Sequence, residues 1–151
     1  FKIIKLRTMI PNAEKDGEQW ADRFDNRITK TGKFLRKLRI DELPQLLLVL
    51  SGEMSLIGPR PERPKIDILL RKHIQNYDLR YSIKPGISGW AQVNYPYGAS
   101  IEDSKLKLSY DIYYIKNFSI LLDFMIFFKT LKIILNRKGS IPNYKNNKNI
   151  Y

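Results

Sequence analysis

The sequence contains one dense group of residues suited to phosphate chemistry, between positions 36 and 60. Two adjacent carboxylates, Asp41 and Glu42, follow a basic run that includes Arg36, and a second arginine, Arg60, stands between two prolines. Arginine binds phosphate oxygens through paired hydrogen bonds, whereas a carboxylate can hold a divalent metal ion or attack phosphorus. This combination predicts a site for a phosphorylated, anionic ligand.

The carboxylate pair also has a purely structural interpretation, which the residues alone leave open. Asp41 can cap the N-terminus of a helix over residues 41–50, and Pro44 is tolerated in its first turn. Near a helix N-terminus the dipole and the free N–H groups favour the ionised, nucleophilic form of Asp41. Leucines recur at the spacing of one buried helical face, namely Leu43, Leu46, Leu47 and Leu50.

Length, charge and composition narrow the class of protein. The chain has 151 residues, 43% of them hydrophobic, which is enough for one folded domain. It has no cysteine and a single histidine, His73, so disulfides, cysteine-ligated metals and thiol nucleophiles are excluded, and a Ser-His-Asp triad is a poor fit. A net charge of +12 favours an anionic partner: nucleic acid, a phosphorylated substrate or an acidic membrane surface.

Hydrophobic spacing predicts an α/β fold that is dominated by helices and has few short strands. Helices are expected over residues 31–37, 41–50, 65–77, 102–116 and 118–136. A short strand is expected over 1–9, where basic and apolar residues alternate, and a short helix near 19–24. A buried segment is expected over 54–57, then a rigid extended turn over 58–61, and further turns around Trp90.

The last expected helix carries a broad apolar face. Ile120, Phe124, Phe127, Phe128, Leu131 and Leu135 share this face, and Lys129, Lys132, Arg137 and Lys138 lie beside or after it. Such a face can pack in the core, or it can lie on a membrane whose anionic lipids attract the basic side chains. The pattern leaves both interpretations open. No stretch reaches the ~18–20 apolar residues of a membrane-spanning helix.

Four motifs occur in a fixed order along the chain. They are KLRTM at 5–9, LRIDELPQL at 38–46, GEMSLIGPRP at 52–61 and KPGISGWAQVN at 84–94. Together they resemble the bacterial sugar transferases, monotopic phosphoglycosyl transferases that load a sugar phosphate onto a polyprenyl phosphate. Later segments at 110–117 and 121–123 are also similar to that family. The YPYGAS sequence at 95–100 resembles the exopolysaccharide-associated branch.

The resemblance implies an enzyme that transfers a sugar 1-phosphate from a nucleotide diphosphate sugar, usually a UDP-sugar, to undecaprenyl phosphate. In this reaction UMP leaves and Mg²⁺ is required. The transfer is the initiating step of exopolysaccharide or related glycan synthesis. It assigns Asp41 as the nucleophile that forms a covalent phosphosugar intermediate, and Glu42 as its catalytic partner. Both are expected Mg²⁺ ligands. The implied phosphate-binding residues are Lys5, Arg7, Arg36 and Arg60.

The same resemblance implies a single membrane-associated catalytic domain over residues 1–139 and a polar tail over 140–151. The family carries an N-terminal membrane helix that this sequence lacks, so we expect a piece of a longer enzyme at the cytoplasmic face of the bacterial inner membrane. Its expected partners are the two substrates and an anionic membrane surface, with no nucleic acid. The alternatives are a non-enzymatic basic module that binds nucleic acid and a membrane-surface scaffold without turnover.

Overall fold

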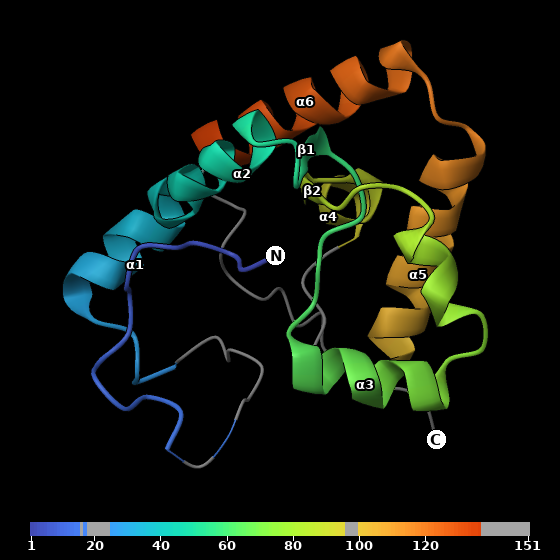
Figure 1. Ribbon diagram of the computed structural model, residues 1–151. Helices are drawn as coiled ribbons and strands as arrows, with labels where there is room; N and C mark the ends of the chain where they lie inside the picture. The colour runs from blue at the N-terminus through green and yellow to red at the C-terminus, as the bar shows by residue number, and fades with distance from the viewer. Residues whose placement is uncertain (16, 18–24, 96–99, 137–151) are drawn as a thin grey trace, which may run out of the picture.

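The computed structural model describes residues 1–15, 17, 25–95 and 100–136, and helices dominate this part of the chain (Figure 1). The α-helices are α1 (Lys30–Lys37), α2 (Leu46–Leu50), α3 (Pro64–His73), α4 (Trp90–Asn94), α5 (Ile101–Lys116) and α6 (Ile120–Leu135). Two 3₁₀ helices, η1 (Ile40–Gln45) and η2 (Tyr77–Tyr81), and two strands, β1 (Ser55–Ile57) and β2 (Gly86–Ser88), complete the described elements. The expectation of a helix-dominated fold with few short strands is confirmed.

The two short strands bring two distant motifs into contact. β1 pairs with β2 in parallel, with Ser55 opposite Gly86 and Ile57 opposite Ser88. The backbones then cross so closely that a Cβ added at Gly86 would lie 2.1 Å from the amide nitrogen of Gly58. Only glycine, which has no Cβ, allows this approach. The crossing holds the rigid turn after β1 against the segment that contains β2.

The N-terminal segment does not form the strand expected over residues 1–9. Residues 1–8 have no regular secondary structure, and an isolated antiparallel bridge joins Met9 to Ile28. Alternation of apolar and basic residues specifies a strand only where a neighbouring strand can pair with it. Here the segment instead contacts η1, through a hydrogen bond from the Leu6 amide to the Asp41 carbonyl oxygen at 3.0 Å.

The helix expected over 41–50 divides into η1 and α2, and the prediction of Asp41 as its N-cap is wrong. The cap position is Arg39, which has a positive φ of 57° and makes no side-chain capping bond. Pro44 lies inside η1, where its missing N–H fits a short irregular turn better than a regular α-helix. Gly52, with φ of 78°, marks the expected end of the segment.

The leucine stripe of this segment is exposed, so the prediction that it is buried is wrong. Leu50 is 84% exposed, and the other three members are also exposed, namely Leu43, Leu46 and Leu47. Instead, Leu48 and Gln45 face inward from the same segment. The 3₁₀ turn of η1 replaces the first turn of the continuous α-helix that the leucine spacing assumed.

The remaining helices follow their sequence signals closely. α1, α5 and α6 begin and end within two residues of the predicted bounds, and Ser100 with Asp103 forms a capping box at the start of α5. The helix expected over 65–77 ends at His73, and the turn expected around Trp90 contains α4. The short helix near 19–24 and the tail over 140–151 lie outside the described residues.

Two apolar clusters form the core. One joins α3 and η2 to α5 through Ile66, Leu70, Ile74, Tyr77 and Leu108, and the other joins β1, α5 and α6 through Ile57, Tyr114, Leu122 and Ile126. In Figure 1, α6 runs as one long rod from α5 toward α1 and α2. α6 therefore connects the second cluster to the part of the chain that carries the carboxylate pair.

The apolar face that the sequence predicted for α6 is exposed, so it does not pack in the core. All six of its members are exposed, with Ile120 at 73% and Leu135 at 80%. The helix packs on the core through Leu122 and Ile126 instead. Among the described helices, none is long and apolar enough to span a bilayer.

The first core cluster should control stability. Leu70 is fully buried on α3, so Leu70→Ala should lower the free energy of unfolding by about 2–5 kcal/mol through lost burial and a residual cavity. Leu69→Ala, on the exposed side of the same helix, is the matched control and should change it by about 0.5 kcal/mol or less. Urea unfolding measures both, and equal effects of the two substitutions would contradict this packing.

Candidate active site

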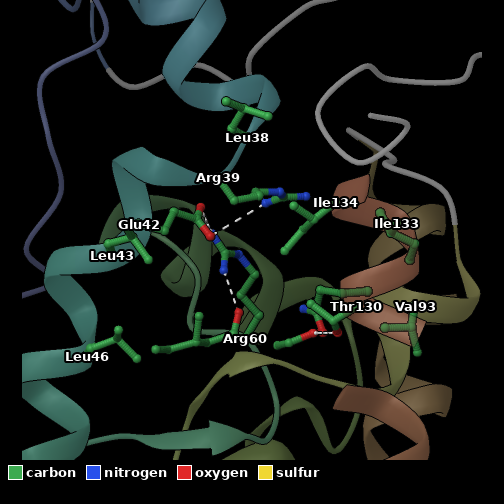
Figure 2. Close-up of a pocket in the computed structure, with 13 residues that line it drawn as sticks. Leu38, Arg39, Glu42, Leu43, Leu46, Arg60, Val93, Thr130, Ile133 and Ile134 are labelled. Carbon is green, nitrogen blue, oxygen red and sulfur yellow. Dashed lines mark hydrogen bonds and ion pairs between the residues drawn. The ribbon is translucent and has the colours of Figure 1, made fainter. Parts of the chain in front are cut away.

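Glu42 lies at the centre of a cluster of cationic side chains. Its Oε1 accepts a hydrogen bond from Arg60, and its Oε2 lies 3.6 Å from Arg39 Nη1 (Figure 2). The same Oε1 lies 3.4 Å from Lys5 Nζ. Burial alone would raise the pKa of Glu42, but the charges of Arg60, Lys5 and Arg39 outweigh it and lower the pKa to about 2. Glu42 is therefore ionised at every pH at which the protein is expected to work.

Asp41 has the opposite electrostatic environment, although it is the next residue. Burial and the neighbouring charge of Glu42 raise the pKa of Asp41, and the charges of Lys5, Arg36 and Arg39 only partly oppose this shift. The expected helix-dipole stabilisation of its ionised form is not found, because Asp41 does not cap a helix. Within the described part of the chain, its buried Oδ1 has no hydrogen-bond partner. This oxygen is therefore an enclosed, unsatisfied hydrogen-bond acceptor.

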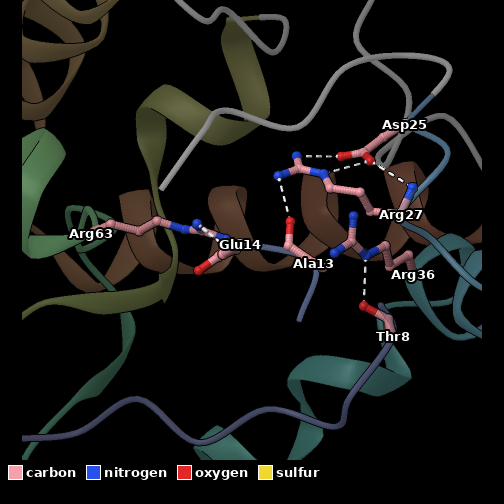
Figure 3. A network of polar contacts seen from close by, with 7 residues as sticks. All are labelled: Thr8, Ala13, Glu14, Asp25, Arg27, Arg36 and Arg63. Carbon is pink, nitrogen blue, oxygen red and sulfur yellow. Dashed lines mark hydrogen bonds and ion pairs between the residues drawn. The ribbon is translucent and has the colours of Figure 1, made fainter. Parts of the chain in front are cut away.

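Arg36 is held close to Asp41 by the N-terminal segment. Its Nε donates to Thr8 Oγ1 at 2.8 Å (Figure 3). Thr8 reaches α1 because Gly32 lacks a side chain: a Cβ there would lie 2.0 Å from the Thr8 carbonyl oxygen. The charge of Arg36 opposes the rise in the pKa of Asp41 and contributes, after Arg27, to the lowered pKa of Asp25.

Arg60 is anchored at both its side chain and its backbone. Its Nη1 donates to the carbonyl oxygen of Ile87 in β2 at 2.8 Å, and its own carbonyl oxygen accepts from Arg80 Nη2 at 2.6 Å. Arg80 is buried and forms an ion pair with the buried Asp111, with 2.9 Å between Nη2 and Oδ2. Desolvation raises the pKa of Asp111 to about 6, against the opposing charge of Arg80. This chain of contacts fixes where the Arg60 guanidinium lies.

The structure brings together most of the predicted site residues. Lys5 and Arg60 contact Glu42, and Arg36 acts on Asp41 through its charge. Arg7 is exposed and forms no ion pair with Asp41 or Glu42. The roles of all these predicted site residues in binding and catalysis stay predictions.

Two groups of the site were not predicted from the sequence. Arg39 contacts Glu42 because of its positive φ, and its place in the basic run directly before the carboxylate pair was the available signal. Arg80 carried no such signal, and Asp111 lay in the 110–117 segment that resembles the family without being singled out. They are far apart in the sequence and meet only through the packing of η2 on α5.

A cavity of about 170 Å³, which we call the η1–α6 cavity, opens beside this cluster. Arg39, Glu42 and Arg60 lie at its polar end. Its other walls are mainly apolar and include Leu43, Leu46, Val93, Ile133 and Ile134. Figure 2 shows Leu43 and Leu46 on one side, Val93 and the α6 residues on the other, and Glu42 and Arg60 between them. Asp41 does not line this cavity.

The site suits a magnesium ion held partly by a substrate. The described residues contain no cluster of three acidic, histidine or cysteine side chains that could enclose a metal by themselves. Both oxygens of Glu42 already face cations, whereas Asp41 has an unpaired buried oxygen. Mg²⁺ is commonly bound by one or two carboxylates together with substrate phosphates, and Asp41 fits that mode better than Glu42.

Comparison with known proteins places these observations in a family. The family model for bacterial sugar transferases matches residues 1–137. The UDP-N-acetylgalactosamine-undecaprenyl-phosphate N-acetylgalactosaminephosphotransferase of Aeromonas hydrophila is 50% identical over 140 residues, covering 93% of this chain and 33% of that protein. The undecaprenyl-phosphate glucose phosphotransferase of Komagataeibacter xylinus is 41% identical over 138 residues, covering 87% and 26%.

A third relative is closer in length. The uncharacterized sugar transferase EpsL of Bacillus subtilis (strain 168) is 40% identical over 143 residues, covering 92% of this chain and 65% of that protein. The chain thus spans a third or less of the first two relatives and about two thirds of the third. The family match covers nearly the whole chain and includes all four ordered motifs. The chain belongs to the bacterial sugar transferase family.

Proposed function

We propose that this protein transfers a sugar 1-phosphate from a UDP-sugar to undecaprenyl phosphate and releases UMP, initiating exopolysaccharide or related glycan synthesis. One observation carries the proposal: the unpaired oxygen of Asp41 lies beside a carboxylate that holds three cations in place. The activities by which the two relatives are named support both substrates. The nucleic-acid alternative is not favoured, because the chain belongs to a family of sugar transferases and the named relatives act on undecaprenyl phosphate.

The proposed reaction is a double displacement at one phosphorus atom. An ionised oxygen of Asp41 attacks the β-phosphorus of the UDP-sugar, a bond from oxygen to phosphorus forms, and the bond to the bridging oxygen breaks as UMP leaves with that oxygen. A phosphate oxygen of undecaprenyl phosphate then attacks the same phosphorus and returns the carboxylate of Asp41. The raised pKa of Asp41 indicates a more basic oxygen, which favours attack once it is ionised.

The cations and Glu42 have different roles in this reaction. Arg60 and Lys5, with Arg36 and Arg39, are placed to stabilise the charge that develops on the transferred phosphoryl group. Glu42 keeps Arg60 and Lys5 oriented before the substrate arrives. This matters because pre-positioned charges need no rearrangement during the reaction. Bound Mg²⁺, held by Asp41 and the donor's phosphates, would neutralise phosphate charge.

We also propose that α6 rests on the anionic surface of the cytoplasmic leaflet, where the lipid acceptor is available. Its exposed face includes Phe124 at 57% and Phe128 at 63% exposure, and Lys132 lies in its last turn. Apolar side chains that enter the headgroup region, flanked by lysines, are typical of helices that lie in the membrane interface.

The assignment of Asp41 as the nucleophile is tested by a substitution that removes its charge and keeps the size of its side chain. Asp41→Asn should reduce UMP release at least 10³-fold in the full-length protein, assayed with UDP-sugars, undecaprenyl phosphate and Mg²⁺. Asp78→Asn, the same change at an exposed position on η2, is the control and should retain full activity. Near-wild-type turnover by a folded Asp41→Asn protein would disprove the assignment.

The pH dependence tests the coupling between the two carboxylates. Asp41 must be ionised to attack, and its pKa is raised, so single-turnover UMP release should fall as pH drops through a value above the ordinary 3.8. Glu42→Gln removes a negative charge that raises the pKa of Asp41, so the acid limb should move to lower pH even though the rate falls. If the acidic fall in the rate stays at the same pH or moves to higher pH in Glu42→Gln, this coupling is absent.

The membrane surface is tested with the 151-residue chain itself. Phe128→Ser should weaken binding to vesicles of phosphatidylglycerol and phosphatidylethanolamine about tenfold, because a large exposed apolar side chain is lost from α6. Phe34→Ser, on α1 with 59% exposure, is the matched control and should leave binding within twofold. Co-sedimentation measures both, and equal loss in the two variants would argue against the α6 surface.

A further inference from the structure

We infer that the η1–α6 cavity binds the isoprene unit next to the phosphate of the lipid acceptor, with that phosphate at the Arg39 and Arg60 end. The inference rests on the proposed function and adds the place at which the acceptor is recognised. It starts from the cavity's two-part lining, in which a cationic end continues into apolar walls.

The lining favours the acceptor over the donor. A polyprenyl phosphate is an amphiphile, anionic at one end and purely hydrocarbon beyond it, which matches a lining that combines the cations Arg39 and Arg60 with mainly apolar walls. A UDP-sugar carries hydroxyls and amide groups along its whole length. Burying these against Leu43 or Ile133 would leave them without hydrogen bonds and would cost free energy.

The volume also favours a small hydrocarbon group. The cavity measures about 170 Å³. Dry cavities of about 150 Å³ bind benzene, a molecule of similar size to one five-carbon isoprene unit. Pockets for drug-sized ligands are roughly 300–1,000 Å³, so a nucleotide with its sugar does not fit.

The cavity is formed before any ligand arrives, and its mouth is open. Ser88 in β2 and Thr130 in α6 share a hydrogen bond of 2.6 Å at the wall of the cavity, which ties β2 to α6. Leu43 and Leu46 line the cavity and are also partly exposed, at 55% and 41%. A lipid can therefore enter beside these leucines without crossing the charged end.

The test fills the cavity from its mouth. Leu46→Trp places a larger apolar side chain at the lining, and Leu47→Trp makes the same change at the next residue of α2, which lies outside the lining. Leu46→Trp should raise KM for undecaprenyl phosphate at least tenfold and leave single-turnover UMP release without acceptor within twofold. Leu47→Trp should leave both quantities within twofold, and thermal unfolding checks that both variants fold.

Binding of undecaprenyl phosphate in detergent micelles gives a second readout that needs no turnover. Leu46→Trp should weaken it at least tenfold relative to Leu47→Trp, while inorganic phosphate should compete poorly with the lipid in the wild type. Unchanged lipid binding in a folded Leu46→Trp protein, or equal losses in both variants, would overturn the inference. Lipid binding that Leu46→Trp abolishes, with no UMP released from any UDP-sugar by the wild type, would reject the proposed reaction and support the cavity.

Discussion

The structure of the site depends on one buried carboxylate that is shared by three cations. Glu42 draws Lys5 from the N-terminal segment, Arg39 from the turn before η1 and Arg60 from the turn after β1. Buried ion pairs add little net stability, because the cost of removing charges from water offsets their attraction. The cluster holds more positive than negative charge, so it keeps cations in place with capacity left for a diphosphate.

Several features of the fold support this cluster. The parallel pairing of β1 and β2, with its two closely packed glycines, sets the path of the turn that carries Arg60. The buried pair of Arg80 and Asp111 then holds the backbone of Arg60 from the opposite side. Arg80 on η2 therefore links Arg60 of the site to Asp111 on α5. A change in how η2 packs on α5 would shift the position of Arg60.

Local signals predicted the regular parts of this structure. Apolar spacing and capping residues located α1, α5 and α6, since both signals act within a few residues of each other. They failed where the outcome depends on distant contacts. The segment before Met9 has strand-like alternation but no paired strand, and the leucine stripe of α2 has helical spacing but no element to cover it.

The site was partly predictable for the same reason. Asp41 and Glu42 stand out as adjacent carboxylates after a basic run, and Arg60 stands out between two prolines, whereas the left-handed backbone of Arg39 gives no sequence signal. That conformation removes the expected helix cap, while burial and the charge of Glu42 raise the pKa of Asp41, whose Oδ1 has no hydrogen-bond partner among the described residues. The electrostatic state of the nucleophile thus follows from tertiary structure.

The central claim is that this oxygen of Asp41 becomes covalently attached to the transferred phosphosugar. Intact-protein mass spectrometry after mixing with a UDP-sugar in the absence of acceptor, followed by peptide mapping, tests it most directly. We predict a mass gain of one sugar phosphate, located on the peptide at Asp41 and removed when undecaprenyl phosphate is added. UMP formed only when acceptor is present, or an adduct on any other residue, would contradict the claim.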